Sequence, residues 1–287
     1  MISNMIRGLF FRLLADTLRK LSKWIHTPTP KMRREARASA KTKTVTFATT
    51  VWEKDWRHVL LDPDYLPNKQ IGNHCYPFAE KLLVINNVAN YDEVYAAASK
   101  WVEKGVLTRI VKAEEWMLIP FQLKRADFKM GADAHKYENV NHDWIYFNAL
   151  GPLAAIHACK SDYLLYHTGD VRLDRPVNWI QATIDHMETH NRFRIANLVW
   201  NGKYDEAKRE SYRKKGPFYF AREGFSDQMF LARRETLFRP IYREIRSDSI
   251  HFPRGDVFEK RVFSYMKNRG WERIIYNRGS YTHENFL

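Results

Sequence analysis

Beyond residue 43, short apolar runs alternate with longer stretches in which apolar residues recur every three or four positions. The short runs are rich in β-branched and aromatic residues, as is typical of buried strands, whereas the longer stretches have helical periodicity. We predict strands at 44–52, 81–88, 107–113, 163–166, 171–173, 193–200 and 271–279. We predict helices at 91–105, 147–161, 178–191 and 256–270.

The C-terminal part of the chain has a more mixed pattern. Residues 216–237 predict a strand, a turn, and then a second strand or a short helix, and residues 280–287 are expected to form a tail. Strands that alternate with helices imply βαβ units and a mainly parallel sheet. We therefore expect residues 44–287 to form a single α/β domain whose sheet is flanked by helices.

The N-terminal segment has a different character. Residues 2–25 place an apolar stripe at helical spacing, with arginines and lysines on the other faces, which is typical of a helix lying at a membrane surface. The prolines of residues 27–30 end this helix, and residues 31–43 form either a basic linker or a continuing helix. Residues 1–43 are thus predicted to be a separate basic amphipathic segment. Docking of the helix on the domain or on a partner protein is the alternative.

The net charge of the chain narrows the range of partners. The 287-residue chain has a formal net charge of +14, which favours polyanions such as an anionic membrane face, nucleic acid or phosphate-bearing substrates. We do not expect a nucleic-acid partner, because no helix-turn-helix, zinc-finger or RNP pattern is present.

Cys75 and Cys159 lie far apart, which gives no disulfide framework and suits a reducing compartment. No segment has the ~20 apolar residues of a membrane-spanning helix.

An acidic turn follows the strand predicted at 163–166. This strand leads into Thr168-Gly169-Asp170. Gly and Asp are ordinary turn residues, so a plain turn is one interpretation. Open α/β sheets, however, bind ligands beyond the carboxyl ends of their strands, so a ligand site is the other.

The order of these elements resembles a GT-A-type glycosyltransferase, most like the family 2 enzymes that use nucleotide-sugar donors. The resemblance covers residues 44–287 and implies a Rossmann-type, GT-A-like fold. The sequence TFATTVWEKD stands where the first strand of that family opens the nucleotide pocket, and VINNVANYDE matches the polar stretch after its second strand. The resemblance implies that donor contacts come from a set of residues near these strand ends: Thr49, Thr50, Glu53, Asn86, Gly169 and Asp170.

The resemblance also implies a metal. In this family a DxD-like motif after the fourth strand binds a divalent cation and the donor diphosphate, and TGDV occupies its place. Asp170 matches the second acid, and Thr168 stands where the first Asp would be. A late histidine ligates the metal or contacts the diphosphate in several members, and His283 is its counterpart. We therefore expect Mn²⁺ or Mg²⁺ at Asp170 and His283, at a degenerate motif.

A general base is expected as well. The family places an acid at the start of a late helix, and Glu259 matches that position, although no Asp stands beside it. Asp227, in a Ser-Asp-Gln turn of the type that faces acceptors, is the competing acid. Both have a structural alternative, since Glu259 could support the helix N-terminus electrostatically and Asp227 could cap a helix. Of the two acids, we narrowly prefer Glu259 as the base.

The predicted reaction is the transfer of a sugar from a nucleotide-sugar donor, a UDP-sugar above all, to a glycan or glycolipid. A basic surface and a lipid-seeking helix fit a membrane glycolipid or lipid-linked saccharide as acceptor, and a base at the start of a helix resembles the inverting group. The expected location is cytoplasmic, at the inner face of a membrane. Two alternatives differ in class: a nucleic-acid-binding protein or nuclease, and a noncatalytic GT-A-like interaction domain.

Overall fold

The structure is a computed structural model that describes residues 43–128, 144–244 and 257–286. The amphipathic helix predicted at 2–25 and the basic linker lie outside the described residues, so both stay predictions. The strands are β1 (Val45–Val51), β2 (Glu80–Ile85), β3 (Arg109–Lys112), β4 (Tyr163–Thr168), β5 (Val171–Leu173), β6 (Phe193–Trp200), β7 (Arg213–Lys215), β8 (Phe218–Ala221), β9 (Met229–Arg233) and β10 (Glu272–His283). The α-helices are α3 (Trp56–Leu61), α4 (Tyr91–Glu103), α5 (Trp144–Ala158), α6 (Ile180–Thr189), α7 (Tyr204–Glu210), α8 (Arg234–Leu237) and α9 (Phe258–Asn268).

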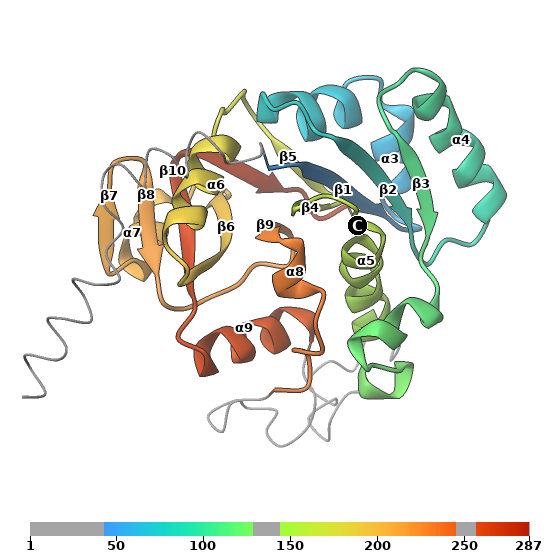
Figure 1. Cartoon of the computed structure of the whole chain (residues 1–287). Coiled ribbons are helices and arrows are strands. Elements are labelled where there is room, and N and C mark those ends of the chain that lie inside the picture. The colour runs from blue at the N-terminus through green and yellow to red at the C-terminus, as the bar shows by residue number, and fades with distance from the viewer. Residues whose placement is uncertain (1–42, 129–143, 245–256, 287) are drawn as a thin grey trace, which may run out of the picture. The chain divides into compact units, whose positions relative to one another are not determined.

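All described strands belong to one sheet (Figure 1). Its order is β3-β2-β1-β4-β9-β6-β10-β8-β7, and β5 pairs with β10 beside this path. The four strands from β3 to β4 are mutually parallel, as βαβ units require. From β9 onward the sheet is mixed, because β9 runs antiparallel to both β4 and β6 while β10 is parallel to β6.

The two faces of the sheet are covered by different helices. Successive side chains of a strand point to opposite faces, and β4 shows the division. Leu164 and Tyr166 pack with residues of α5 and α9, whereas Tyr163 and Leu165 pack with α6 on the other face. The helices α3 and α4 cover β1 and β2 in a further apolar cluster (Figure 1). The predicted α/β fold with flanking helices is therefore confirmed. The sheet is not mainly parallel as predicted, because the C-terminal strands β7 to β10 add antiparallel pairs.

The last strand differs from its prediction. Strand β10 does not stop at Gly279 but continues to His283, so the segment expected as a tail is largely part of the sheet. The pairing of β10 with β6 shifts register between Tyr276 and Ser280, and a Cβ at Gly279 would lie 2.8 Å from the side chain of Val177. The glycine marks an irregularity where the backbone passes close to a neighbour, rather than a strand end.

The elements that were not predicted from the pattern include the short helices α3 and α7 and the exposed edge strand β7. Among the described residues, no helix is both long enough and apolar enough to cross a bilayer.

Candidate active site

The carboxyl ends of β1, β2 and β4 lie side by side, because these strands are parallel neighbours. Strand β9 is antiparallel to β4, so its beginning reaches the same edge, and the Thr168 amide donates to the Gln228 carbonyl at 2.9 Å. The end of β10 arrives there too, since His283 pairs with Val171 of β5. Segments far apart in the sequence therefore meet at one edge of the sheet, which we call the acidic edge.

Asp170 and His283, the two predicted metal ligands, are in direct contact. The His283 Nε2 atom lies 2.9 Å from Asp170 Oδ2, and the Thr168 hydroxyl donates to Asp170 Oδ1 at 2.7 Å. The side-chain nitrogen of Gln228 lies 3.3 Å from His283 Nδ1. A carboxylate oxygen only accepts, so Nε2 of His283 carries a proton that faces Asp170.

The surroundings of Asp170 hold it as a carboxylate. Burial opposes ionisation, but the hydrogen bond and the charge of His283 outweigh it, together with the hydrogen bond from Thr168. The net effect lowers the pKa of Asp170. Thr168 stands where the family motif has its first Asp. Here it donates a hydrogen bond to Asp170, which stands at the position of the second Asp.

The two competing acids, Asp227 and Glu259, interact with each other. Burial raises the pKa of Asp227 to about 7, and the charge of Glu259 adds to the shift. His283 and Lys260 act in the opposite direction. The sequence offers Asp227 and Glu259 as alternative bases. In the fold, the charge of Glu259 raises the pKa of Asp227 and so favours its protonated form. A carboxyl group with a pKa near neutrality suits proton transfer.

A further carboxyl group, Asp55, lies beneath the turn. It is 1% exposed, and the Trp52 amide donates to its Oδ1 at 2.8 Å. Burial raises the pKa of Asp55 well above its usual range, and the nearby charge of Asp170 contributes. A Cβ at Gly169 would lie 2.4 Å from Asp55 Oδ2 and 2.8 Å from the Thr50 carbonyl oxygen. Only glycine fits between them.

The predicted donor contacts of β1 are buried side chains. Thr49 is 0% exposed. The Thr50 hydroxyl accepts from Tyr166 at 3.0 Å, and its methyl group would lie 2.9 Å from a Cβ at Gly151 of α5. Both threonines thus position the strand end, and their predicted contact with a donor stays a prediction.

The predicted donor contacts around β2 hold the loop after that strand. The Glu53 carboxylate accepts from the Ala89 amide at 2.7 Å. The Asn86 side chain donates to the Phe147 carbonyl at 2.7 Å, while its buried oxygen has no partner among the described residues. The loop that faces the acidic edge is therefore anchored to α5 and to the end of β1.

The donor set of Asp170 and His283 fits a divalent cation. A carboxylate oxygen beside an imidazole nitrogen suits Mn²⁺ better than Mg²⁺, which prefers oxygen ligands, and water and phosphate oxygens would complete either shell. Among the described residues, no group of three or more His, Cys, Asp or Glu side chains could hold a metal alone. A cation here would thus take the remaining ligands from a bound diphosphate, and it would replace the Nε2 proton of His283.

Comparison with known proteins finds no matching protein-family model and no matching curated protein. Solved structures do match. The chain is similar to nucleotide-sugar glycosyltransferases. One is the mannosyltransferase PcManGT from Pyrobaculum calidifontis in complex with GDP-Man and Mn²⁺, with 14% identity, a TM-score of 0.48, and coverage of 85% of this chain and 58% of that one.

Two other matches belong to the same broad class. GalNAc-T7 with UDP, GalNAc and Mn²⁺ has 12% identity and a TM-score of 0.46, covering 85% of this chain and 44% of that one. Glucosyl-3-phosphoglycerate synthase from Mycobacterium tuberculosis, with Mn²⁺, UDP and glucosyl-3-phosphoglycerate, has 12% identity and a TM-score of 0.43. The match covers 91% of this chain and 78% of that one. The chain spans only about half the length of the first two. At these identities the likeness concerns the fold.

The prediction from the sequence did not include several residues of the acidic edge. Asp55 is part of the TFATTVWEKD sequence but carries no signal of its own, because a buried acid looks like any other acid in a sequence. Asn201 accepts from the His283 amide at 2.8 Å, and Ser226 lies 3.0 Å from the Tyr281 hydroxyl. These contacts join residues distant in the sequence, so only the sheet topology reveals them.

Proposed function

We propose that the chain transfers a sugar from a nucleotide-diphosphate donor to an acceptor hydroxyl at the acidic edge. One observation carries the proposal: the contact between Asp170 and His283 at the strand ends, beside an acid whose pKa is raised to about 7. The motifs that resemble GT-A glycosyltransferases fall on these same residues. The donor class is a nucleotide sugar, with a UDP-sugar as the first choice.

Asp170 and His283 would hold the divalent cation and orient the diphosphate. A bound Mn²⁺ or Mg²⁺ would supply Lewis-acid stabilisation of the leaving diphosphate. Thr168 and Gln228 fix the carboxylate and the imidazole from behind. Such preorganisation matters because the site then needs little rearrangement when charge develops.

Asp227 is the base that the electrostatics favour, although the motif favours Glu259. Burial raises the pKa of Asp227 close to neutrality, where a base both ionises and accepts a proton effectively. Glu259 would act through Asp227 by raising its pKa. Direct attack of the deprotonated hydroxyl on the anomeric carbon inverts its configuration, and this is the stereochemistry that we propose.

The acceptor that we propose is a glycolipid or a lipid-linked saccharide on an anionic membrane. The support is the sequence of residues 2–25, together with the net charge of +14. Replacing Leu9 and Leu13 by Asp in the full chain should abolish sedimentation with phosphatidylserine vesicles. Unchanged sedimentation of this variant would exclude the helix as the anchor and, with it, the proposed location at the inner face of a membrane.

Donor binding tests the central proposal. Thermal unfolding should be measured with UDP-, GDP- and dTDP-sugars, with and without Mn²⁺. A ligand at 100 times its Kd stabilises the folded state by about 2.7 kcal/mol, so one donor class should raise the Tm only when Mn²⁺ is present. Asp170→Asn and His283→Ala should remove that shift.

The control variant is Asp185→Asn, which removes an exposed acid of α6 and should keep the full shift. A Tm that no nucleotide sugar changes, or an equal shift in Asp170→Asn, would contradict the proposal.

A further inference from the structure

A second pocket lies at the opposite edge of the sheet from Asp170. It is lined by the residue that begins β3, Arg109, by Lys160 just before β4, and by Arg234 just after β9. Strands β4 and β9 are antiparallel, with Tyr163 opposite Arg233, so the start of one and the end of the other coincide. The pocket has a volume of about 470 Å³, and we call this side of the sheet the basic edge.

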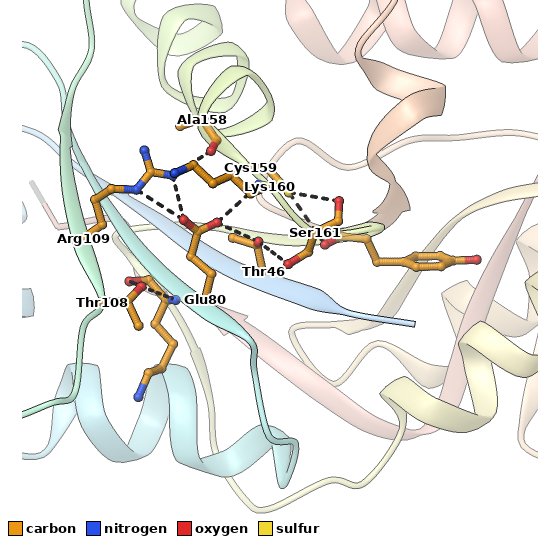
Figure 2. A network of polar contacts seen from close by, with 10 residues as sticks. Thr46, Glu80, Thr108, Arg109, Ala158, Cys159, Lys160 and Ser161 are labelled. Atoms are coloured by element: carbon orange, nitrogen blue, oxygen red, sulfur yellow. Dashed lines mark hydrogen bonds and ion pairs between the residues drawn. The ribbon is translucent and has the colours of Figure 1, made fainter. Parts of the chain in front are cut away.

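A hydrogen-bond network fixes one wall of this pocket (Figure 2). The Arg109 guanidinium donates to Glu80 Oε1 from Nε at 3.2 Å and from a terminal nitrogen at 2.6 Å, and it also reaches the Ala158 carbonyl at 2.7 Å. The other Glu80 oxygen accepts from the Thr46 hydroxyl at 2.9 Å and from the Lys160 amide at 3.3 Å. Arg109 is thus rigid, and its charge is balanced by Glu80.

Two other cations of the pocket are not balanced in this way. Neither the Arg234 guanidinium nor the Lys160 ammonium forms an ion pair within the ranges that the structure describes. Arg234 is positioned by stacking on Phe238, 4.1 Å from the ring centre. The Nε atom of Arg234 and the Nδ1 atom of His157 are both buried without a hydrogen-bond partner in the described part of the chain. Unsatisfied buried nitrogens of this kind call for a ligand or water.

The rest of the lining is apolar. Trp116 is 51% exposed, and its ring meets His157 edge-on at 5.2 Å. Val111 and Met117 extend the apolar surface. The volume is within the range of pockets that take small organic molecules, and it is far larger than one phosphate needs.

We propose that this pocket binds a small phosphorylated organic molecule. The phosphate is recognised by the Arg234 guanidinium and the Lys160 ammonium, because a guanidinium matches phosphate oxygens with paired hydrogen bonds. The organic part lies against Trp116. The pocket is separate from the donor site, since β4 begins at the basic edge and ends at the acidic edge.

Calorimetric titration of the full chain with phenyl phosphate and with inorganic phosphate, in EDTA, tests the proposal. Phenyl phosphate should bind saturably and more tightly than inorganic phosphate. Arg234→Gln should weaken its binding at least about tenfold, as expected for the loss of charged hydrogen bonds. Trp116→Ala should bring its affinity close to that of inorganic phosphate.

Arg239→Gln is the matched control, because it removes the same charge from an exposed arginine outside the pocket and should leave binding unchanged. Lys160→Gln, at an exposed position, should also weaken binding and serves as the test if Arg234→Gln does not fold. Absence of saturable binding, or equal weakening in Arg239→Gln, would overturn the proposal. In a separate titration without EDTA, displacement of phenyl phosphate by UDP with Mn²⁺ would assign the binding to the donor site instead. None of these outcomes depends on glycosyltransferase activity.

Discussion

The two edges of the sheet are built from the same strands but have opposite electrostatics. At the acidic edge, Asp170 contacts the His283 imidazole and Asp227 interacts with both His283 and Glu259. The carboxyl pKa values diverge: that of Asp170 is lowered and that of Asp227 is raised to about 7. At the basic edge, the Glu80 carboxylate pairs with Arg109, and the pocket is lined by the cations Arg109, Lys160 and Arg234.

This difference shows how one sheet separates two kinds of charge. A cluster of acids suits a metal cation and the removal of a proton, whereas unbalanced cations suit a phosphate. Strands β4 and β9 run from one edge to the other, and substitutions at well-separated sites usually have additive effects. Changes at one edge should therefore leave the other edge unaffected, and the following predictions test that separation.

The largest expected effect is on the rate of sugar transfer. Asp227→Asn should lower turnover by about 10²–10⁴, the usual contribution of a general base, while the thermal shift with donor is preserved. Glu259→Gln should reduce turnover less, because it changes the base indirectly. The reverse order in steady-state kinetics would assign the base to Glu259, as the motif alone suggests.

The pH dependence of turnover should be the next largest effect. Asp227 is protonated below its raised pKa of about 7, so turnover should rise about tenfold per pH unit up to that value and then level off. Glu259→Gln removes a neighbouring negative charge that raises this pKa, so the midpoint should move to lower pH. An unchanged midpoint in the pH–rate profile of Glu259→Gln would contradict the coupling of the two acids.

Stability at the acidic edge should depend on the small size of Gly169. Gly169→Ala places a Cβ against Asp55 and the Thr50 carbonyl, so urea unfolding should show a loss of about 1–3 kcal/mol. Adding Asp55→Ala removes one of the two clashes, and the double variant should be less destabilised than the sum of the single ones. Strict additivity would show that the clash is not the cause.

The smallest effect is expected from the network of the basic edge. Glu80→Gln removes the charge partner of Arg109 but keeps its shape, and it should cost about 1–2 kcal/mol in urea unfolding. Turnover at saturating substrate should stay unchanged, because Glu80 lies at the opposite end of the strands. Glu103→Gln, at an exposed position in the last turn of α4, is the control and should not destabilise the fold. A loss of turnover in Glu80→Gln would break the separation of the two edges.

The sequence predicts the regular part of the fold well, because buried strands need apolar runs. Strand β6 has the predicted bounds, Phe193–Trp200. Gly279 misled the prediction of β10, since a glycine that admits a close neighbour looks the same as one that ends a strand. The candidate site was harder. Motif order suggests Asp170 and His283, but the interaction of Asp227 with Glu259 and the burial of Asp55 depend on long-range packing that no local pattern encodes.

The position of β10 has a consequence for how the protein is made. This strand lies between β6 and β8 in the sheet, and it carries His283. At roughly 5–20 residues per second, the ribosome delivers β10 on the order of ten seconds after β4. Until then β6 and β8 have unpaired edges that invite aggregation, and Asp170 has no imidazole beside it. The nascent chain therefore completes its sheet and its candidate site in the same late step, which makes this interval the one in which a chaperone would matter most.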